Sequence, residues 1–176
     1  LDNWREIRQR RNFEDMITAE VTHPEEIDHI KRMFSFLSDM MGMEFILQNL
    51  CSDVGSPACV TEGPYKFNAH DLVVIYYAWQ ISRIPLPPNP TIVEIGGGYG
   101  LLAAKLANLI PDSKIILLDL PELNAVSAYY LQQCYPEATF SLYASKPKNA
   151  AFTILPGWMA PQIGHADLVI NTRSMM

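Results

Sequence analysis

Apolar residues recur at helical spacing in the first part of the chain. Between residues 21 and 48 they stand three or four positions apart, at Ile27, Ile30, Phe34, Leu37 and Met41. This period predicts an amphipathic helix. Gly42 is expected to bend or break that helix, because glycine is a weak helix former.

A second helix is predicted after a turn-rich stretch. Glycine and proline are frequent between residues 51 and 67, which is typical of turns. Asn68 and Asp71 then resemble a helix N-terminal cap. The next apolar residues share one helical face, at Leu72, Ile75, Tyr76 and Trp79. We therefore expect residues 1–84 to form a mostly helical N-terminal region.

The pattern changes after the proline-rich connector at residues 85–90, which can be neither helix nor central strand. Aliphatic runs then alternate with helical segments. Strands are expected at residues 91–95, 114–118, 138–143 and 167–171, a short extended piece at 152–155, and helices at 101–110 and 123–134. This alternation predicts an α/β domain at residues 91–176, with a Rossmann-like, doubly wound parallel sheet.

Composition and charge exclude several classes of protein. The 176 residues are 49% hydrophobic and 18% charged, which is typical of a folded domain and not of a disordered chain. The net charge of −6 argues against a nucleic-acid partner. The longest apolar run, residues 72–79, is too short for a membrane span, which takes about 20 residues. We expect neither a nucleic acid nor a membrane as partner.

The three cysteines stand far apart and form no CxxC pair. Neither a disulfide framework nor a cysteine zinc site is therefore expected. His, Asp and Glu residues show no metal-ligand spacing, so no metal is expected. A reducing, cytoplasmic setting agrees with this use of cysteine.

A glycine-rich loop follows the first expected strand of the α/β domain, and a helix follows the loop. The loop reads Glu94-Ile95-Gly96-Gly97-Gly98-Tyr99-Gly100. Backbone N–H groups between a strand and a helix N-terminus can receive a polar or anionic ligand. A purely structural tight turn is the alternative. A dinucleotide fingerprint, GxGxxG or GxGxxA, would need glycine or alanine at position 101, where the chain has leucine.

Acidic residues on either side of the loop indicate which ligand it takes. Glu94 would repel a pyrophosphate and would suit an ammonium group. S-adenosyl-L-methionine (SAM) carries an ammonium, a sulfonium and a carboxylate, but no phosphate. Asp119, about 20 residues beyond the loop, ends the second expected strand, where an acidic side chain can accept hydrogen bonds from both ribose hydroxyls. Helix capping is the alternative role for Asp119.

These motifs resemble those of a known family. VEIGGGYG at residues 93–100 resembles the first motif of class I SAM-dependent methyltransferases, and DLP at 119–121 is similar to the segment after strand two in many small-molecule O-methyltransferases. More narrowly, EIGGGYG, LLDLPEL, YYLQ and INT together are similar to the sugar O-methyltransferase family. Plant-type O-methyltransferases share the GGG and DLP features.

The resemblance implies a role for each matching residue. Glu94 and the backbone of Gly96, Gly97, Gly98, Tyr99 and Gly100 would hold the methionyl end of SAM, and Asp119 the ribose. Leu120 would pack near the adenine. Leu155, with Pro156 and Trp158, would follow strand three and line the adenine pocket. Asn171 and Thr172 would end strand four near the reactive methyl.

The implied activity is direct methyl transfer from SAM to a hydroxyl of a small molecule, for example a sugar or a sugar-containing metabolite. The residues identify no catalytic base with certainty, and His70 is the one candidate. Residues 55–68 and the start of the helix after them are expected to form a lid over the methyl group, with Tyr65, Lys66, Asn68 and His70 nearest the acceptor. A packing role on the outer helices is the alternative.

Two other functions stay open at this stage. One is a nucleotide-binding oxidoreductase of the NAD type, and the other is a non-catalytic, methyltransferase-like interaction domain. Class I methyltransferases have seven strands, whereas four are expected here. We therefore expect the C-terminal strands of the sheet to be missing, and either a longer parent chain or a partner, such as a second copy in a homo-oligomer, to cover the open edge.

Overall fold

The computed structural model describes residues 21–50, 53–143 and 149–172. The chain divides into two compact units, Leu1–Tyr76 and Tyr77–Met176. The division falls inside helix α5 (Ala69–Ser82). The sequence predicted a division at the connector instead, and residues 85–90 do lie outside any helix or strand.

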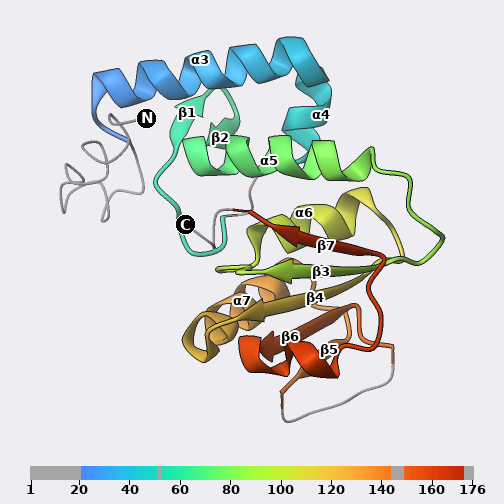
Figure 1. Ribbon diagram of the computed structural model, residues 1–176. Coiled ribbons are helices and arrows are strands. Elements are labelled where there is room, and N and C mark those ends of the chain that lie inside the picture. The colour runs from blue at the N-terminus through green and yellow to red at the C-terminus, as the bar shows by residue number, and fades with distance from the viewer. Residues whose placement is uncertain (1–20, 51–52, 144–148, 173–176) are drawn as a thin grey trace. The chain divides into compact units, whose positions relative to one another are not determined.

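Two helices open the described part of the first unit, as the apolar period predicted. Helix α3 (Pro24–Met41) ends at Gly42, and α4 (Met43–Gln48) begins after it (Figure 1). Gly42 has a φ of 87°, a backbone conformation that side chains with a Cβ rarely adopt. The predicted break at this glycine is confirmed.

The stretch predicted as turns contains a small antiparallel hairpin. Strands β1 (Val60–Glu62) and β2 (Tyr65–Phe67) pair around Gly63, which has a φ of 59°. The expectation of a mostly helical region was incomplete here. Each strand has only three residues, of which two are exposed and one is buried. Neither strand therefore shows the alternation of apolar and polar residues by which strands are predicted.

One apolar cluster holds the described elements of the first unit together. It takes residues from both helices, both hairpin strands and the start of α5: Ile30, Leu37, Ile46, Val60, Phe67, Leu72 and Ile75. The rings of Phe34 and Phe67 stack at 4.6 Å between centroids. Asn68 caps α5, because its Oδ1 accepts a hydrogen bond of 2.9 Å from the backbone N–H of Asp71. The predicted cap is thus confirmed.

The second unit contains a five-stranded parallel sheet in the order β5-β6-β4-β3-β7. The strands are β3 (Thr91–Ile95), β4 (Lys114–Asp119), β5 (Phe140–Leu142), β6 (Phe152–Pro156) and β7 (Leu168–Asn171). The predicted α/β class with a Rossmann-like parallel sheet is confirmed. The predicted number of four full strands was wrong, because the extended piece at 152–155 is a strand paired on both sides.

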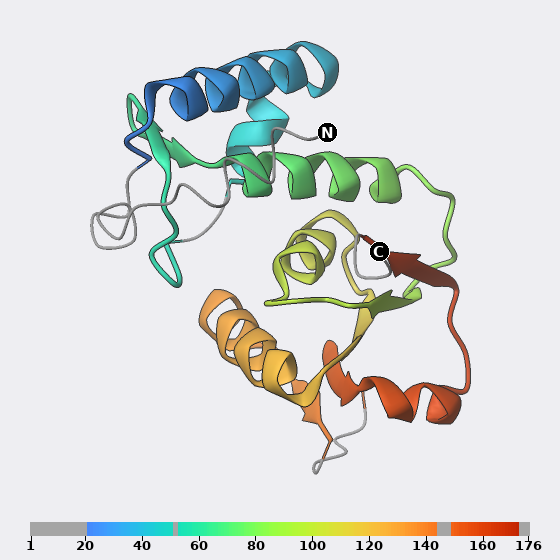
Figure 2. The ribbon, with the colours of Figure 1, turned by 60° about the vertical axis from the view of Figure 1, so that its left-hand side comes forward.

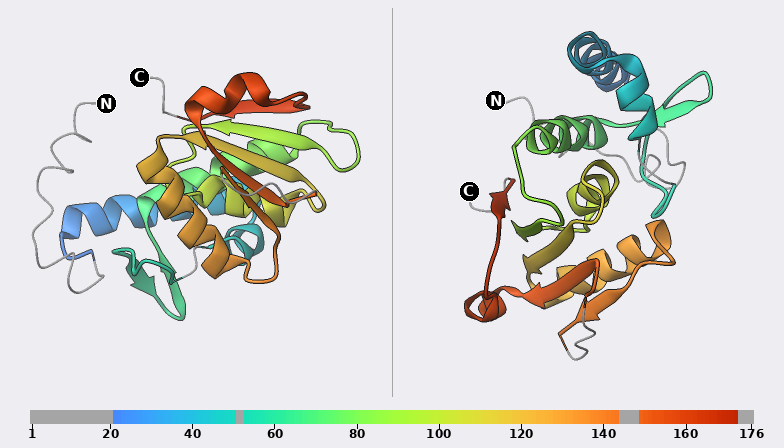
Figure 3. Two further views of the ribbon diagram at one scale, coloured as in Figure 1. Left: turned by 90° about the horizontal axis from the view of Figure 1, so that it is seen from below. Right: turned by 90° about the vertical axis from the view of Figure 1, so that its right-hand side faces the viewer.

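Helices cover both faces of this sheet. Helices α6 (Leu101–Leu109) and α7 (Pro121–Cys134) lie on one face, and the 3-10 helix η1 (Gly157–Gln162) lies on the other (Figures 2 and 3). The hydroxyl of Tyr135 donates a hydrogen bond of 2.5 Å to the carbonyl of Ala104, which ties the end of α7 to α6. In the described part of the chain, no helix is both long enough and apolar enough to span a membrane.

A short polar cluster joins the starts of β3 and β7. The carboxylate of Asp167 accepts a hydrogen bond of 2.8 Å from the N–H of Thr91, and its other oxygen lies 3.0 Å from Nε2 of His165. The bond from Thr91 and then the bond from His165 lower the pKa of Asp167 below its usual value. The ionised carboxylate therefore stabilises the fold above the pKa of the unfolded chain.

We expect Asp167→Asn to lower the melting temperature at neutral pH. The ionised carboxylate stabilises the native state above its ordinary pKa of 3.8, and this contribution is lost as the pH falls through the lower pKa of the folded state. Thermal unfolding at pH 7 and at pH 3.5 measures the difference, which should shrink at the lower pH. Asp112→Asn, at an exposed aspartate before β4, is the matched control. Equal melting temperatures for Asp167→Asn and the parent at pH 7 would contradict the expectation.

Candidate functional site

The register of the sheet gathers most of the predicted site residues at one edge. Ile95, the last residue of β3, pairs with Leu118 of β4 and with Asn171 of β7. In parallel strands the carboxyl ends share one edge, so the glycine loop, Asp119 with Leu120, and Asn171 with Thr172 all begin there. Figure 1 shows the arrows of β3, β4 and β7 running side by side.

Leu155 takes a different position from the predicted one. It lies inside β6, paired with Leu118, and not in a segment after the strand. Pro156 is the last residue of β6 and pairs with Asp119. Trp158 follows in η1, with 63% of its surface exposed. The correction follows from the missed strand, because the true carboxyl end of β6 is Pro156.

The glycine loop has a shape that requires glycine. Gly96, Gly98 and Gly100 have φ values of 75°, 56° and 92°. Gly97 has an ordinary φ, but a Cβ there would lie 2.8 Å from Cδ2 of Leu117, a core side chain. The loop is thus fixed by backbone conformation at three positions and by close packing at the fourth.

Hydrogen bonds and helix α7 hold this loop in place. The N–H of Gly96 donates to the carbonyl of Leu118 at 2.7 Å, and the N–H of Gly100 to the carbonyl of Gly97 at 2.9 Å. The ring of Tyr99 meets that of Tyr130 edge-on, with 5.0 Å between centroids. The loop is therefore anchored to β4 and braced by α7.

Asp119 connects the end of β4 to the glycine loop. Its Oδ2 accepts a hydrogen bond of 2.7 Å from the N–H of Gly98, and its Oδ1 accepts one of 2.7 Å from the N–H of Leu120. A carboxylate has about four acceptor positions. Two acceptor positions therefore remain for hydroxyl groups of a ligand. Leu120 is 64% exposed beside it.

Glu94 is the most unusual group at this edge. It is 2% exposed, and its Oε2 is buried without a hydrogen-bond partner among the residues that the structure describes. Burial, and secondly the charge of Asp119, raise the pKa of Glu94 to about 7. A buried carboxylate oxygen without a donor is costly, so such groups are rare outside functional sites.

Asn124, which the sequence analysis did not single out, supports the same turn. It is 9% exposed in the first turns of α7, and its Nδ2 lies 3.5 Å from the backbone carbonyl of Asp119. Its Oδ1 is buried with no hydrogen-bond partner among the described residues. The contact is local, since it joins the end of β4 to the first turns of α7 five residues later.

His70 belongs to the other compact unit. It is an exposed residue in the first turn of α5, whereas the glycine loop and Asp119 lie in the second unit. Tyr65, Lys66 and Asn68 also belong to the first unit. The role of His70 as a base, and that of residues 55–68 as a lid, stay predictions.

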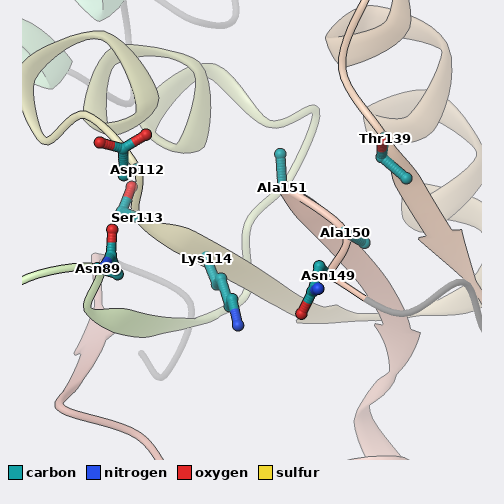
Figure 4. Close-up of a pocket in the computed structure, with 8 residues that line it drawn as sticks. All are labelled: Asn89, Asp112, Ser113, Lys114, Thr139, Asn149, Ala150 and Ala151. Atoms are coloured by element: carbon teal, nitrogen blue, oxygen red, sulfur yellow. The ribbon is translucent and has the colours of Figure 1, made fainter.

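A surface pocket of about 370 Å³ lies at the opposite edge of the sheet. Its lining comes from the segments that precede the strands, including Asn89, Lys114, Thr139 and Asn149, and Figure 4 shows Lys114 and Asn149 side by side. These residues lie at the amino ends of β3, β4, β5 and β6. The pocket is therefore separate from the glycine loop, which leaves the carboxyl end of β3.

Comparison with known proteins gives matches among solved structures only. No family model matches the chain, and no curated protein does. The mitomycin 7-O-methyltransferase MmcR matches with 23% identity and a TM-score of 0.42, over 61% of this chain and 29% of its own. Human N-acetylserotonin methyltransferase in complex with SAM matches with 22% identity and a TM-score of 0.35, over 58% of this chain and 24% of its own.

A third match is a protein-L-isoaspartate O-methyltransferase, with 13% identity and a TM-score of 0.46, over 81% of this chain and 47% of its own. The chain thus spans less than half the length of each of these proteins.

We expect Glu94→Gln to stabilise the ligand-free protein at alkaline pH. The unfolded chain ionises Glu94 near 4.5 and the folded chain near 7, so the native state binds more protons between these values and loses stability as the pH rises. At about 1.4 kcal/mol for each pKa unit, the variant should gain about 3 kcal/mol at pH 8.

Urea unfolding of both proteins at pH 4.5 and pH 8 measures this gain, which should be small at the lower pH. Glu137→Gln, at an exposed glutamate of the same unit, is the matched control and should show no comparable change between the two pH values. A constant difference between Glu94→Gln and the parent at both pH values would show that Glu94 ionises at its ordinary pKa.

Proposed function

We propose that the second unit binds SAM at the carboxyl edge of its sheet and belongs to an enzyme that transfers the methyl group to a hydroxyl of a small molecule. The observation that carries the proposal is Glu94, a buried side chain two residues before the first glycine, whose Oε2 has no hydrogen-bond partner among the residues that the structure describes. A positively charged group that donates hydrogen bonds would stabilise such an oxygen.

The residues present suit the parts of SAM. The ammonium of its methionyl end would satisfy Oε2 of Glu94, and the loop from Gly96 to Gly100 would face the same end with its backbone. The remaining acceptor positions of Asp119 match the two ribose hydroxyls. Leu120, which is largely exposed, would pack on the adenine. Asn171 and Thr172, where β7 ends, would lie near the methyl group.

A dinucleotide suits the same edge less well. A pyrophosphate over the loop would meet the carboxylate of Asp119, and like charges at such a site repel one another. It would also bring no hydrogen-bond donor to Oε2 of Glu94. Leu101 also stands where the dinucleotide fingerprint needs glycine or alanine. These features favour SAM over NAD as the ligand.

In the proposed reaction, bound SAM supplies a methyl carbon that its sulfonium makes electrophilic. The chain's own part is to hold the two ends of that ligand and to orient an acceptor oxygen in line with the methyl carbon. A base has to accept the hydroxyl proton, and His70 is the candidate. The sequence similarity to sugar O-methyltransferases makes a sugar hydroxyl the first acceptor to test.

The first unit would complete the site as a lid. Residues 55–68 and the first turn of α5 carry the polar groups Tyr65, Lys66, Asn68 and His70, which would surround the acceptor. A lid of this kind excludes water from the reacting groups and orients the acceptor. This part of the proposal rests on the sequence alone.

The direct test is binding of SAM and of NAD to the purified chain by titration calorimetry. We expect SAM to bind and NAD not to bind. Asp119→Ala should weaken SAM by on the order of 2–3 kcal/mol, since charge-assisted hydrogen bonds to the ribose are lost. Asp119→Asn should lose less, because an amide oxygen still accepts.

Asp112→Asn, at the opposite edge of the sheet, serves as the matched control and should bind SAM as the parent does. Binding of NAD without binding of SAM would overturn the proposal in favour of an oxidoreductase. Unchanged SAM affinity in a folded Asp119→Ala protein would limit that residue to its contacts with Gly98 and Leu120.

A separate expectation concerns the lid. His70→Ala and Tyr65→Ala should lower the rate of methyl transfer to a panel of sugars and phenols at least tenfold and leave SAM affinity almost unchanged, because both residues act on the acceptor. Formation of S-adenosylhomocysteine measures the rate. His165→Ala, at an exposed histidine of the second unit, is the control. A normal rate in both lid variants would remove the first unit from the reaction.

A further inference from the structure

Two acidic side chains lie at the carboxyl edge of the sheet, and they differ in their hydrogen-bond donors. Asp119 has a backbone N–H donor for each of its oxygens, from Gly98 and from Leu120. Glu94 is 2% exposed, and its Oε2 has no donor among the described residues. When two acids share a site, the one with donors keeps its charge and the one without them holds the proton.

We propose that Glu94 carries a proton in the ligand-free protein and releases it to solvent when the ligand's ammonium group binds, so that SAM binding is coupled to the loss of one proton. The inference rests on the function proposed above. Its chemistry balances, since the O–H bond of the neutral carboxyl breaks, the proton passes to buffer, and the carboxylate formed pairs with the ammonium.

The charged groups around Glu94 agree with this assignment. Its partners in the sheet, Leu117 on β4 and Ile170 on β7, are apolar. The titratable groups on the loop and on neighbouring elements are Tyr99 on the loop, Asp119 and Lys114 on β4, Lys105 on α6, Glu122, Tyr129, Tyr130 and Cys134 on α7, and His165 and Asp167 before β7. Lys114, His165 and Asp167 lie at the other ends of the strands.

Lys105 on α6 is also buried, at 5% exposure, and it is not among the causes of the pKa shift of Glu94. The pKa of Glu94 is raised to about 7, first by desolvation and then by the charge of Asp119. A carboxyl with this pKa is about nine-tenths protonated at pH 6 and about half protonated at pH 7. The ligand's own amino group, with an ordinary pKa of about 7.7–8.0, is already charged at pH 6.

The coupling has a second consequence for specificity. When the bound ligand has no ammonium group, Glu94 stays protonated, because an unpaired buried carboxylate is costly in free energy. Such a ligand should bind without proton release. The proton thus reports whether the amino-acid end of a ligand, and not its nucleoside end, has reached Glu94.

The experiment is titration calorimetry of the 176-residue chain at pH 6 in two buffers of different ionisation heat, phosphate and imidazole. We expect the binding heats of SAM and of S-adenosylhomocysteine to differ between the buffers by an amount that corresponds to about 0.9 proton released. SAM should also bind about fivefold more tightly at pH 7 than at pH 6. Binding of 5′-methylthioadenosine, which lacks the ammonium, should show neither effect.

Glu94→Gln is the matched variant, because it keeps the shape of the side chain and cannot ionise. It should bind SAM more weakly than the parent does at pH 7, with no proton release and with an affinity that does not change from pH 6 to pH 7. The parent protein alone also tests the coupling, because S-adenosylhomocysteine should release a proton when it binds and 5′-methylthioadenosine should not.

The two proposals fail in different ways. SAM binding whose heat is the same in both buffers, or proton release that persists in Glu94→Gln, overturns the coupling and leaves the proposed function intact. Equal proton release with 5′-methylthioadenosine also overturns it, because the proton would then come from a group at the nucleoside end. No SAM binding at any pH overturns the proposed function, and this inference with it.

Discussion

The hydrogen bond from the N–H of Gly98 to the carboxylate of Asp119 is the contact on which the candidate site depends. It joins the middle of the glycine loop to the end of the neighbouring strand at 2.7 Å. The loop has further backbone hydrogen bonds at Gly96 and Gly100, but this one ties its middle to β4. The same bond holds Asp119 near Glu94, whose pKa is raised first by burial and then by the charge of Asp119.

Much of the second unit could be predicted from the sequence, because its elements are marked locally. The β-branched run at 91–95 and the glycines after it identify β3 and its turn, and KIILL identifies β4. Residues 152–155 were predicted only as a short extended piece, because the segment is short and is followed by proline. Only the pairing of Leu117 with Ile154 and of Asp119 with Pro156 reveals a strand inside the sheet.

The candidate site, too, has features that could be predicted from the local sequence and features that depend on long-range packing. The types and spacing of Glu94, Asp119 and the glycines follow from the chain itself, and the parallel register then brings them to one edge. The burial of Glu94, and the lack of a hydrogen-bond partner for its Oε2 among the described residues, depend on how the sheet and the helices pack around it. No pattern along the sequence encodes this burial, so the electrostatic character of the site is visible only in three dimensions.

Helix α5 belongs to both compact units, since the division falls between Tyr76 and Tyr77 in its middle. A helix forms and melts cooperatively, because a short isolated segment of a few residues has little helical stability in water. The last turns of α5 in the second unit therefore depend on the turns that Asn68 caps in the first unit. Because one continuous helix crosses the division, the helical turns on its two sides stabilise one another.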